Sequence, residues 1–176
     1  KAQWLSKYPN HQVVNLRGNV NTRLHKLQDN DWAGAVFAAA GLERINLKPE
    51  NHIELDWMIP APAQGAMLVV TMEHNSVCRT ALKPINHSET ALAVKVERDF
   101  LRTLEGGCTA PIGALASITG NILKLKAGLF SLDGKEKYLI EESTPLEQVD
   151  GFGKRCAKLV LQQGGDRLMK ELRKVL

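Results

Sequence analysis

Apolar residues recur every three or four positions between residues 86 and 107, which predicts an amphipathic helix. Asn86 and Glu89 have the spacing of a capping box at its start, and Gly106 and Gly107 are expected to end it. The apolar stripe consists of Ala93, Val96, Phe100 and Leu104.

Three strands are predicted after this helix, at residues 108–118, 121–131 and 137–143. The second alternates strictly between Leu123, Leu125 and Ala127 on one side and Lys124 and Lys126 on the other. Such alternation is typical of an antiparallel sheet with one face in water. The short connections "TGN" and "DGK" favour hairpins.

Two further helices are predicted at the end of the chain, separated by Gly164 and Gly165. The apolar residues that mark them are Cys156, Leu159 and Val160 in the first, and Leu168, Leu172, Val175 and Leu176 in the second.

The beginning of the chain has a different pattern, in which short apolar runs alternate with helical periods. Residues 11–16 and 34–40 are predicted strands, and helices are expected from about Gly18, through Val20, Leu24 and Leu27, and at residues 42–47. This order indicates an α/β layer with a parallel sheet. The segment "PAPAQGA" (60–66) is typical of a connection, and the run at 67–73 predicts a strand that needs neighbours elsewhere.

The composition fits a soluble globular protein: of 176 residues, 44% are hydrophobic and 24% charged, and no apolar run reaches the roughly 20 residues of a membrane helix. Three cysteines far apart fit neither a disulfide framework nor a metal site, and the five histidines lack ligand spacing. We therefore expect a cytoplasmic protein without a metal and without a membrane partner. The first residues lack an initiator Met and a signal peptide, so the chain is expected to be part of a longer one.

Arg17 and Gly18 lie at a predicted strand-to-helix turn, with Arg23 in the first helical turns and Arg44 after the next predicted strand. Helix N-termini and arginine forks bind carboxylates and phosphates, so these residues are candidate anion ligands. They could equally be surface residues that make weak ion pairs.

Cys108 follows two glycines at the end of the long helix. The glycines leave space beside the sulfur, which suits a thiol that carries a bulky group, although a cysteine at a helix end more often fills a core. Cys78 and Cys156 lack such surroundings, so neither is a candidate for this role, and Cys156, which lies on an apolar stripe, is interpreted as a packing residue.

Five ordered segments resemble porphobilinogen deaminase, also called hydroxymethylbilane synthase: "LRGNVNTRL", "AAGLERI", "PAPAQGA", "NHSETALAVKVERDFLRTLEGGC" and "PIGALA". The resemblance implies an enzyme of haem biosynthesis that polymerises porphobilinogen into hydroxymethylbilane and releases ammonia at each addition. It also implies a dipyrromethane cofactor, built from substrate and tied by a thioether to Cys108.

The resemblance further implies the fold and the site. The fold would be part of a periplasmic-binding-protein-like α/β domain pair with parallel and mixed sheets, followed by a small α+β domain with a three-stranded antiparallel sheet and helices. Residues 1–60 would complete the second domain, 61–84 would return to the first, and 85–176 would form the third. Ligands of the cofactor and of the growing polypyrrole chain would be Arg17, Gly18, Arg23, Arg44, Gln64, Gly65 and Ala66.

The resemblance implies that the catalytic aspartate lies in the N-terminal part of the first domain, which is expected to precede this sequence. Asp29, Asp31 and Asp56 match no catalytic segment, so the isolated chain is expected to be inactive and the full-length protein a monomer. Two alternatives stay open: an inactive structural piece, or a basic module that binds anions or nucleic acid. Because aromatic residues are only 5% of the chain and no basic stripe is present, nucleic acid is not expected as a partner.

Overall fold

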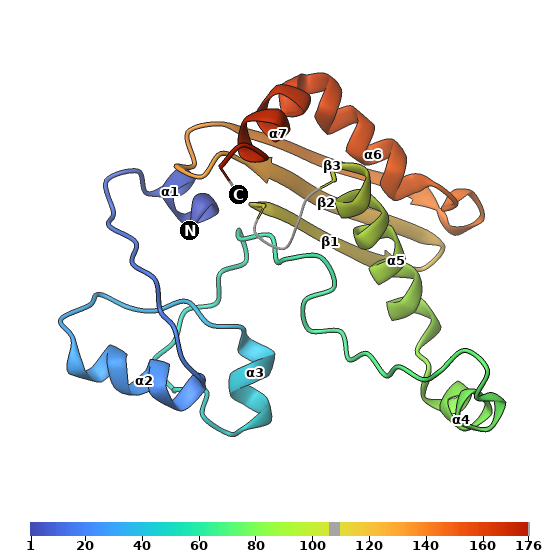
Figure 1. Ribbon diagram of the computed structural model, residues 1–176, viewed down its shortest axis with the longest axis horizontal. Coiled ribbons are helices and arrows are strands. Elements are labelled where there is room, and N and C mark those ends of the chain that lie inside the picture. The colour runs from blue at the N-terminus through green and yellow to red at the C-terminus, as the bar shows by residue number, and fades with distance from the viewer. Residues whose placement is uncertain (106–109, 176) are drawn as a thin grey trace. The chain divides into compact units, whose positions relative to one another are not determined.

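A computed structural model describes residues 1–105 and 110–175 of the chain. The described elements are the helices α1 (Ala2–Lys7), α2 (Val20–Asp29), α3 (Ala39–Arg44), α4 (Ser76–Leu82), α5 (Ser88–Thr103), α6 (Phe152–Val160) and α7 (Asp166–Leu172), and the strands β1 (Ile112–Thr119), β2 (Ile122–Phe130) and β3 (Lys137–Pro145) (Figure 1). The chain divides into two compact units. The larger unit consists of Lys1–Pro9 and Trp57–Leu176, and the smaller unit is Asn10–Asp56.

The three strands form one antiparallel sheet in the order β1-β2-β3, as the alternation of leucine and lysine predicts. In the register, Ala116 lies opposite Leu125, and Leu125 lies opposite Glu142. Gly120, in the tight connection from β1 to β2, has φ 58°, a conformation that glycine adopts without strain. The predicted small α+β domain with a three-stranded sheet is therefore confirmed.

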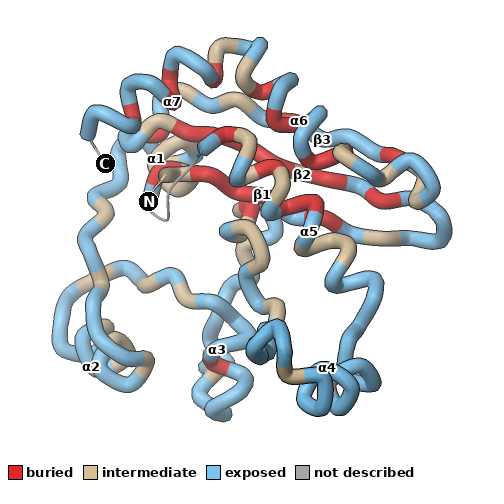
Figure 2. Tube along the Cα trace, turned by 45° about the vertical axis from the view of Figure 1, so that its right-hand side comes forward, coloured by how far each residue is buried: buried red, intermediate tan, exposed pale blue. Residues whose placement is uncertain are grey.

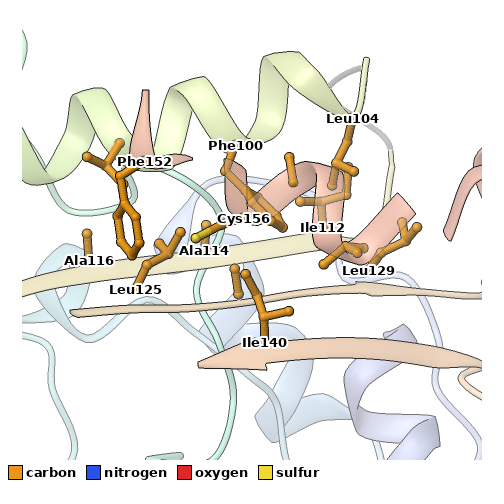
Figure 3. Close-up of a cluster of buried hydrophobic side chains, with 14 of the residues drawn as sticks. Phe100, Leu104, Ile112, Ala114, Ala116, Leu125, Leu129, Ile140, Phe152 and Cys156 are labelled. Atoms are coloured by element: carbon orange, nitrogen blue, oxygen red, sulfur yellow. The ribbon is translucent and has the colours of Figure 1, made fainter. Parts of the chain in front are cut away.

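The hydrophobic core of the larger unit lies between this sheet and the helices α5 and α6, which cover one of its faces (Figure 3). Val96, Phe100 and Leu104 from the predicted helical stripe are buried there. Leu123 and Leu125 of β2 are buried against them, while Lys124 between them is exposed. The two sequence periods, 3.6 for the helix and 2 for the strand, thus point to the same core.

The start of α5 differs from the predicted capping box. His87, and not Asn86, is the capping residue: its ring Nδ1 accepts a hydrogen bond from the backbone N–H of Thr90 at 3.2 Å. Glu89 lies in the first turn, where its negative charge favours the positive end of the helix. A histidine ring nitrogen can replace the usual hydroxyl or carboxylate because it too is a hydrogen-bond acceptor.

The two helices at the end of the chain are confirmed with one change. Gly164, with φ 118°, separates α6 from α7 as predicted, because a left-handed backbone interrupts the helix. Cys156 and Val160 lie in the core, but Leu159 is exposed because the helix turns it away from the sheet. Val175 is exposed as well, and Leu176 lies outside the described residues.

The three strands predicted before residue 80 are wrong for this structure, since residues 1–105 contain helices and irregular segments only. Residues 11–16 and 67–73 are irregular, and α3 begins inside the run 34–40. A strand exists only where a neighbour accepts its hydrogen bonds, and no described segment pairs with these runs. Many of their apolar side chains are exposed, among them Val14, Val36 and Val70, whereas Val13, Leu16 and Phe37 are half-buried (Figure 2).

The helix predicted after Gly18 is confirmed as α2, whereas the one predicted at 42–47 is α3, which ends at Arg44.

Candidate functional site

The first candidate feature is the start of α2. Gly18 has φ 123°, and a Cβ there would lie 2.9 Å from the Cβ of Thr22, so glycine is required by both backbone and space. Asn19 caps the helix, because its Oδ1 accepts from the backbone N–H of Thr22 at 2.8 Å and from the Thr22 hydroxyl at 2.9 Å. The local sequence thus positions Arg17 just before a capped helix N-terminus; the predicted helix start is confirmed, whereas the strand predicted before it is absent.

Several basic residues lie before α2, along it and on α3. Arg17 is exposed, and the Nζ of Lys26 donates a hydrogen bond to its backbone carbonyl at 3.1 Å. Among the described residues, the Nε of Arg23 is the one buried side-chain nitrogen or oxygen that has no hydrogen-bond partner. An unsatisfied buried donor costs roughly 1–3 kcal/mol, which an acceptor such as a carboxylate would recover. Arg44 is exposed in the last turn of α3.

The second candidate feature is a turn of residues 61–66, called the Gln64 turn below. The backbone N–H of Gln64 donates to the carbonyl of Ala61 at 3.0 Å, and the Gln64 side-chain oxygen accepts from the N–H of Ala61 at 3.3 Å. Gly65 has φ 86° and is exposed, and Ala66 is half-buried. The three residues predicted to line a cofactor cleft are therefore brought together in one tight turn.

The carboxylate of Glu97 binds this turn to the rest of the larger unit. One oxygen accepts from the N–H of Ala63 at 2.7 Å, and the other accepts from the N–H of Ala116 in β1 at 2.8 Å. Glu97 is only 5% exposed. Burial raises the pKa of its carboxyl group, and the two backbone donors oppose part of that rise.

Sequence reasoning missed Glu97. The available signal is its position four residues after Ala93, on the face of α5 that also carries Val96 and Phe100. A carboxylate on a buried helix face must find hydrogen-bond donors, and that requirement could have identified it.

Two more contacts fix the chain as it enters the Gln64 turn. The side chain of Gln3 donates to the carbonyl of Ile59 at 2.7 Å and accepts from the N–H of Ile59 at 2.8 Å. The N–H of Ala114 donates to the carbonyl of Pro60 at 3.0 Å. Gly113 permits this approach, since a Cβ there would lie 2.9 Å from the carbonyl oxygen of Ile59. Residues 59 and 60 are thus attached along the free edge of β1.

A left-handed residue follows the end of α5. Glu105 has φ 53°, and its carboxylate pairs with Arg173 at 2.8 Å. Both side chains are largely exposed, so this ion pair adds little stability. The predicted stop at Gly106 and Gly107 and the predicted thioether cysteine, Cys108, lie outside the described residues.

Cys156 is buried in the core, whereas Cys78 is exposed. Cys156 is 1% exposed, and burial raises the pKa of its thiol to about 11; the charge of Glu142 adds to the rise and that of Arg155 opposes it. Interpreting Cys156 as a packing residue is therefore confirmed. Cys78 is exposed on α4 and does not belong to the core.

Thiol alkylation is expected to separate these two cysteines. At pH 8, iodoacetamide should modify Cys78 within minutes and leave Cys156 unmodified until the chain is unfolded, because a neutral, covered thiol does not react. Peptide mapping by mass spectrometry assigns the label to each cysteine, and Cys78→Ser serves as the control that removes the rapid label at position 78. Rapid labelling of Cys156 in the folded chain would contradict its place in the core.

Neither a membrane span nor a metal cluster is found in the part of the chain that the structure describes. None of its helices combines the length and the apolar character that crossing a bilayer requires. No group of three His, Cys, Asp or Glu side chains among these residues could hold a metal ion.

Comparison with known proteins gives a consistent result along the chain. Residues 1–80 match the family model described as porphobilinogen deaminase, dipyromethane cofactor binding domain, and residues 91–162 match the porphobilinogen deaminase C-terminal domain. Curated relatives named porphobilinogen deaminase include that of Campylobacter hominis, 38% identical over 97% of this chain and 56% of its own length. That of Syntrophomonas wolfei is 35% identical over 98% of this chain and 57% of its own length. The chain thus spans little more than half the length of these relatives.

Proposed function

Because the chain belongs to the porphobilinogen deaminase family, we propose that it takes part in the stepwise, deaminating polymerisation of porphobilinogen to hydroxymethylbilane in haem biosynthesis. In this proposal the chain supplies the attachment of a dipyrromethane cofactor, through a thioether at Cys108, and several of the groups that hold it. We propose further that the catalytic aspartate implied by the resemblance is supplied by residues other than those printed here.

The observation that carries the proposal is the start of α2. It combines Arg17 before a capped helix N-terminus with Arg23, whose buried Nε has no partner among the described residues. This segment lies inside the stretch that matches the family's cofactor-binding domain. An unsatisfied guanidinium donor at a helix start is suited to an anionic ligand.

The residues fit the proposed cofactor chemically. The resemblance implies that each pyrrole carries an acetate and a propionate, so the ligand is a polyanion with several carboxylates. Arg17, Arg23 and Arg44 offer one guanidinium fork each, and a fork can bind a carboxylate through two parallel hydrogen bonds. Gly65 leaves backbone accessible to a ligand because it has no side chain. When bound, dipyrromethane supplies the pyrrole end to which new units are added.

We also propose the domain assignment implied by the resemblance: 1–60 in a second α/β domain, 61–84 returning to a first, and 85–176 as the third. The run after the Gln64 turn supports the assignment of this segment to another domain, because five apolar residues there are more than half exposed: Met67, Leu68, Val69, Val70 and Met72. A further domain that covers this run would remove its apolar surface from water, which is stabilising. We place the reaction in the cytoplasm and expect a monomer.

Supplying the proposed catalytic domain tests this function. The chain is co-expressed with the N-terminal part of the Campylobacter hominis relative and given porphobilinogen. We expect ammonia release, loss of porphobilinogen and a product that reacts with Ehrlich's reagent, none of which the chain produces by itself.

A matched pair of arginine variants distinguishes the loss of a ligand contact at the proposed site from the loss of positive charge elsewhere on the chain. Arg23→Ala is expected to lower turnover about tenfold or more, since a hydrogen bond to a charged group contributes roughly 1.5–3 kcal/mol. Arg98→Ala, on an exposed position of α5, is expected to leave turnover unchanged. A folded complex without ammonia release, or equal loss in both variants, would contradict the proposed function.

A further inference from the structure

Glu97 is an unusual residue for the position that it occupies. Two polar residues are buried among the described residues, Glu97 and Thr144, and of these only Glu97 has an ionisable side chain. Moving a carboxylate out of water is costly unless donors replace the water. Its partners are backbone N–H groups, and no described lysine or arginine contributes to the stabilisation of its charge. An apolar residue would pack on this face of α5 without that cost.

The carboxylate lies where three segments meet. Ala114 and Ala116 are two positions apart on β1, which is an edge strand of the sheet, and both direct their N–H groups to the free edge. The carbonyl of Pro60 satisfies the first donor and Glu97 satisfies the second. Since its other oxygen binds Ala63, Glu97 connects α5, the edge of β1 and the Gln64 turn through one side chain.

Ala63 makes this contact in a backbone conformation that alanine avoids. Its φ is 64°, in the left-handed region, and Gly65 two residues later has φ 86°. A left-handed alanine persists only where surrounding contacts hold it. The charge-assisted hydrogen bond from Ala63 to Glu97, at 2.7 Å, is such a contact.

We propose that Glu97 is a positioning residue for ligand binding: it holds Ala63 left-handed and so sets where Gln64, Gly65 and Ala66 present their backbone to the polypyrrole ligand. This inference rests on the proposed function for the identity of the ligand. Glu97 itself does not touch the ligand and acts through the turn. Two acceptor oxygens are needed, so glutamine, which has one, cannot make both contacts.

The first part of the test uses the chain alone. In Glu97→Gln, amide hydrogen exchange at Ala63 or Ala116 is expected to accelerate about tenfold or more, because one donor loses a charged acceptor. Exchange at Leu125 in β2 is expected to stay unchanged. The control is Val96→Ala, which removes core contacts from the neighbouring buried residue and should lower Tm without a selective effect at Ala63.

The second part measures turnover of the complex with the N-terminal part of the relative. Glu97→Gln is expected to raise KM for porphobilinogen several-fold, and Val96→Ala to leave KM unchanged. Adding Ala63→Gly to Glu97→Gln is expected to restore KM in part, because glycine adopts a positive φ without strain, while the lost amide protection is not restored.

Each result decides one claim. Unchanged exchange at both Ala63 and Ala116 in Glu97→Gln would overturn the proposal, and so would faster exchange with a KM equal to that of the wild type. If the wild-type complex shows no turnover, the proposed function fails, and the exchange result by itself decides whether Glu97 holds the turn.

Discussion

Replacing Cys108 by alanine is expected to abolish covalent attachment of the cofactor and to reduce turnover to background. Alanine has no nucleophile, so no thioether can form, and the polymerisation then lacks a bound pyrrole end to extend. The measurement is ammonia release by the complex with the N-terminal part of the Campylobacter hominis relative, together with the intact mass of the chain after exposure to porphobilinogen.

Cys78→Ala is the matched control for this experiment. Cys78 is an exposed thiol on α4, outside the segments that hold the proposed site, so its removal should leave both the adduct and turnover unchanged. A Cys108→Ala chain that keeps an added mass would show that another residue is the anchor. Equal losses in the two variants would indicate a nonspecific thiol effect.

Phe100→Ala is expected to destabilise the larger unit by about 3–5 kcal/mol, because a fully buried aromatic ring is replaced by a cavity. Phe100 has no exposed surface and packs between α5, α6 and the sheet, near Cys156 (Figure 3). Urea unfolding followed by circular dichroism measures the loss as a lower midpoint at nearly unchanged slope.

Leu159→Ala is the control for the core variant. Leu159 lies on α6 but is 40% exposed, so its truncation should cost less than about 1 kcal/mol. A loss of that small size for Phe100→Ala as well would contradict the position of its ring in the core.

The part of the fold that the sequence predicts well is the part whose partners are close in the chain. Leu123 and Leu125 alternate with Lys124, and the hairpin at Gly120 joins β2 to its neighbour, so the pattern indicates both the strand and its partner. The helical stripe through Val96 and Phe100 then matches the apolar face of that sheet. Local periodicity and short turns suffice because the contacts are local.

The runs at 11–16, 34–40 and 67–73 show where this reasoning fails. An apolar run such as "MLVVTME" indicates a preference for burial and for an extended backbone, but it does not indicate which strand accepts its hydrogen bonds. Val70 is 80% exposed, and the segment is irregular. Strand formation depends on a partner, and composition alone does not supply one.

The candidate site divides in the same way. Arg17 and Gly18 were predictable because the turn, the cap and the helix start are consecutive in sequence, and the structure has that geometry. Glu97 was missed because its partners, Ala63 and Ala116, are 34 and 19 residues away. The proposal that Glu97 is a positioning residue depends on three segments that meet in space and are far apart in the sequence. The role of the arginines and of Cys108 toward a ligand stays a prediction.

The most direct test of the central claim is peptide mass spectrometry of the wild-type chain, loaded with porphobilinogen in the complex. The account predicts that the peptide containing Cys108 gains the mass of two porphobilinogen units less two molecules of ammonia, and that no other peptide gains it. An unmodified Cys108 peptide from a preparation that turns over porphobilinogen would contradict the account.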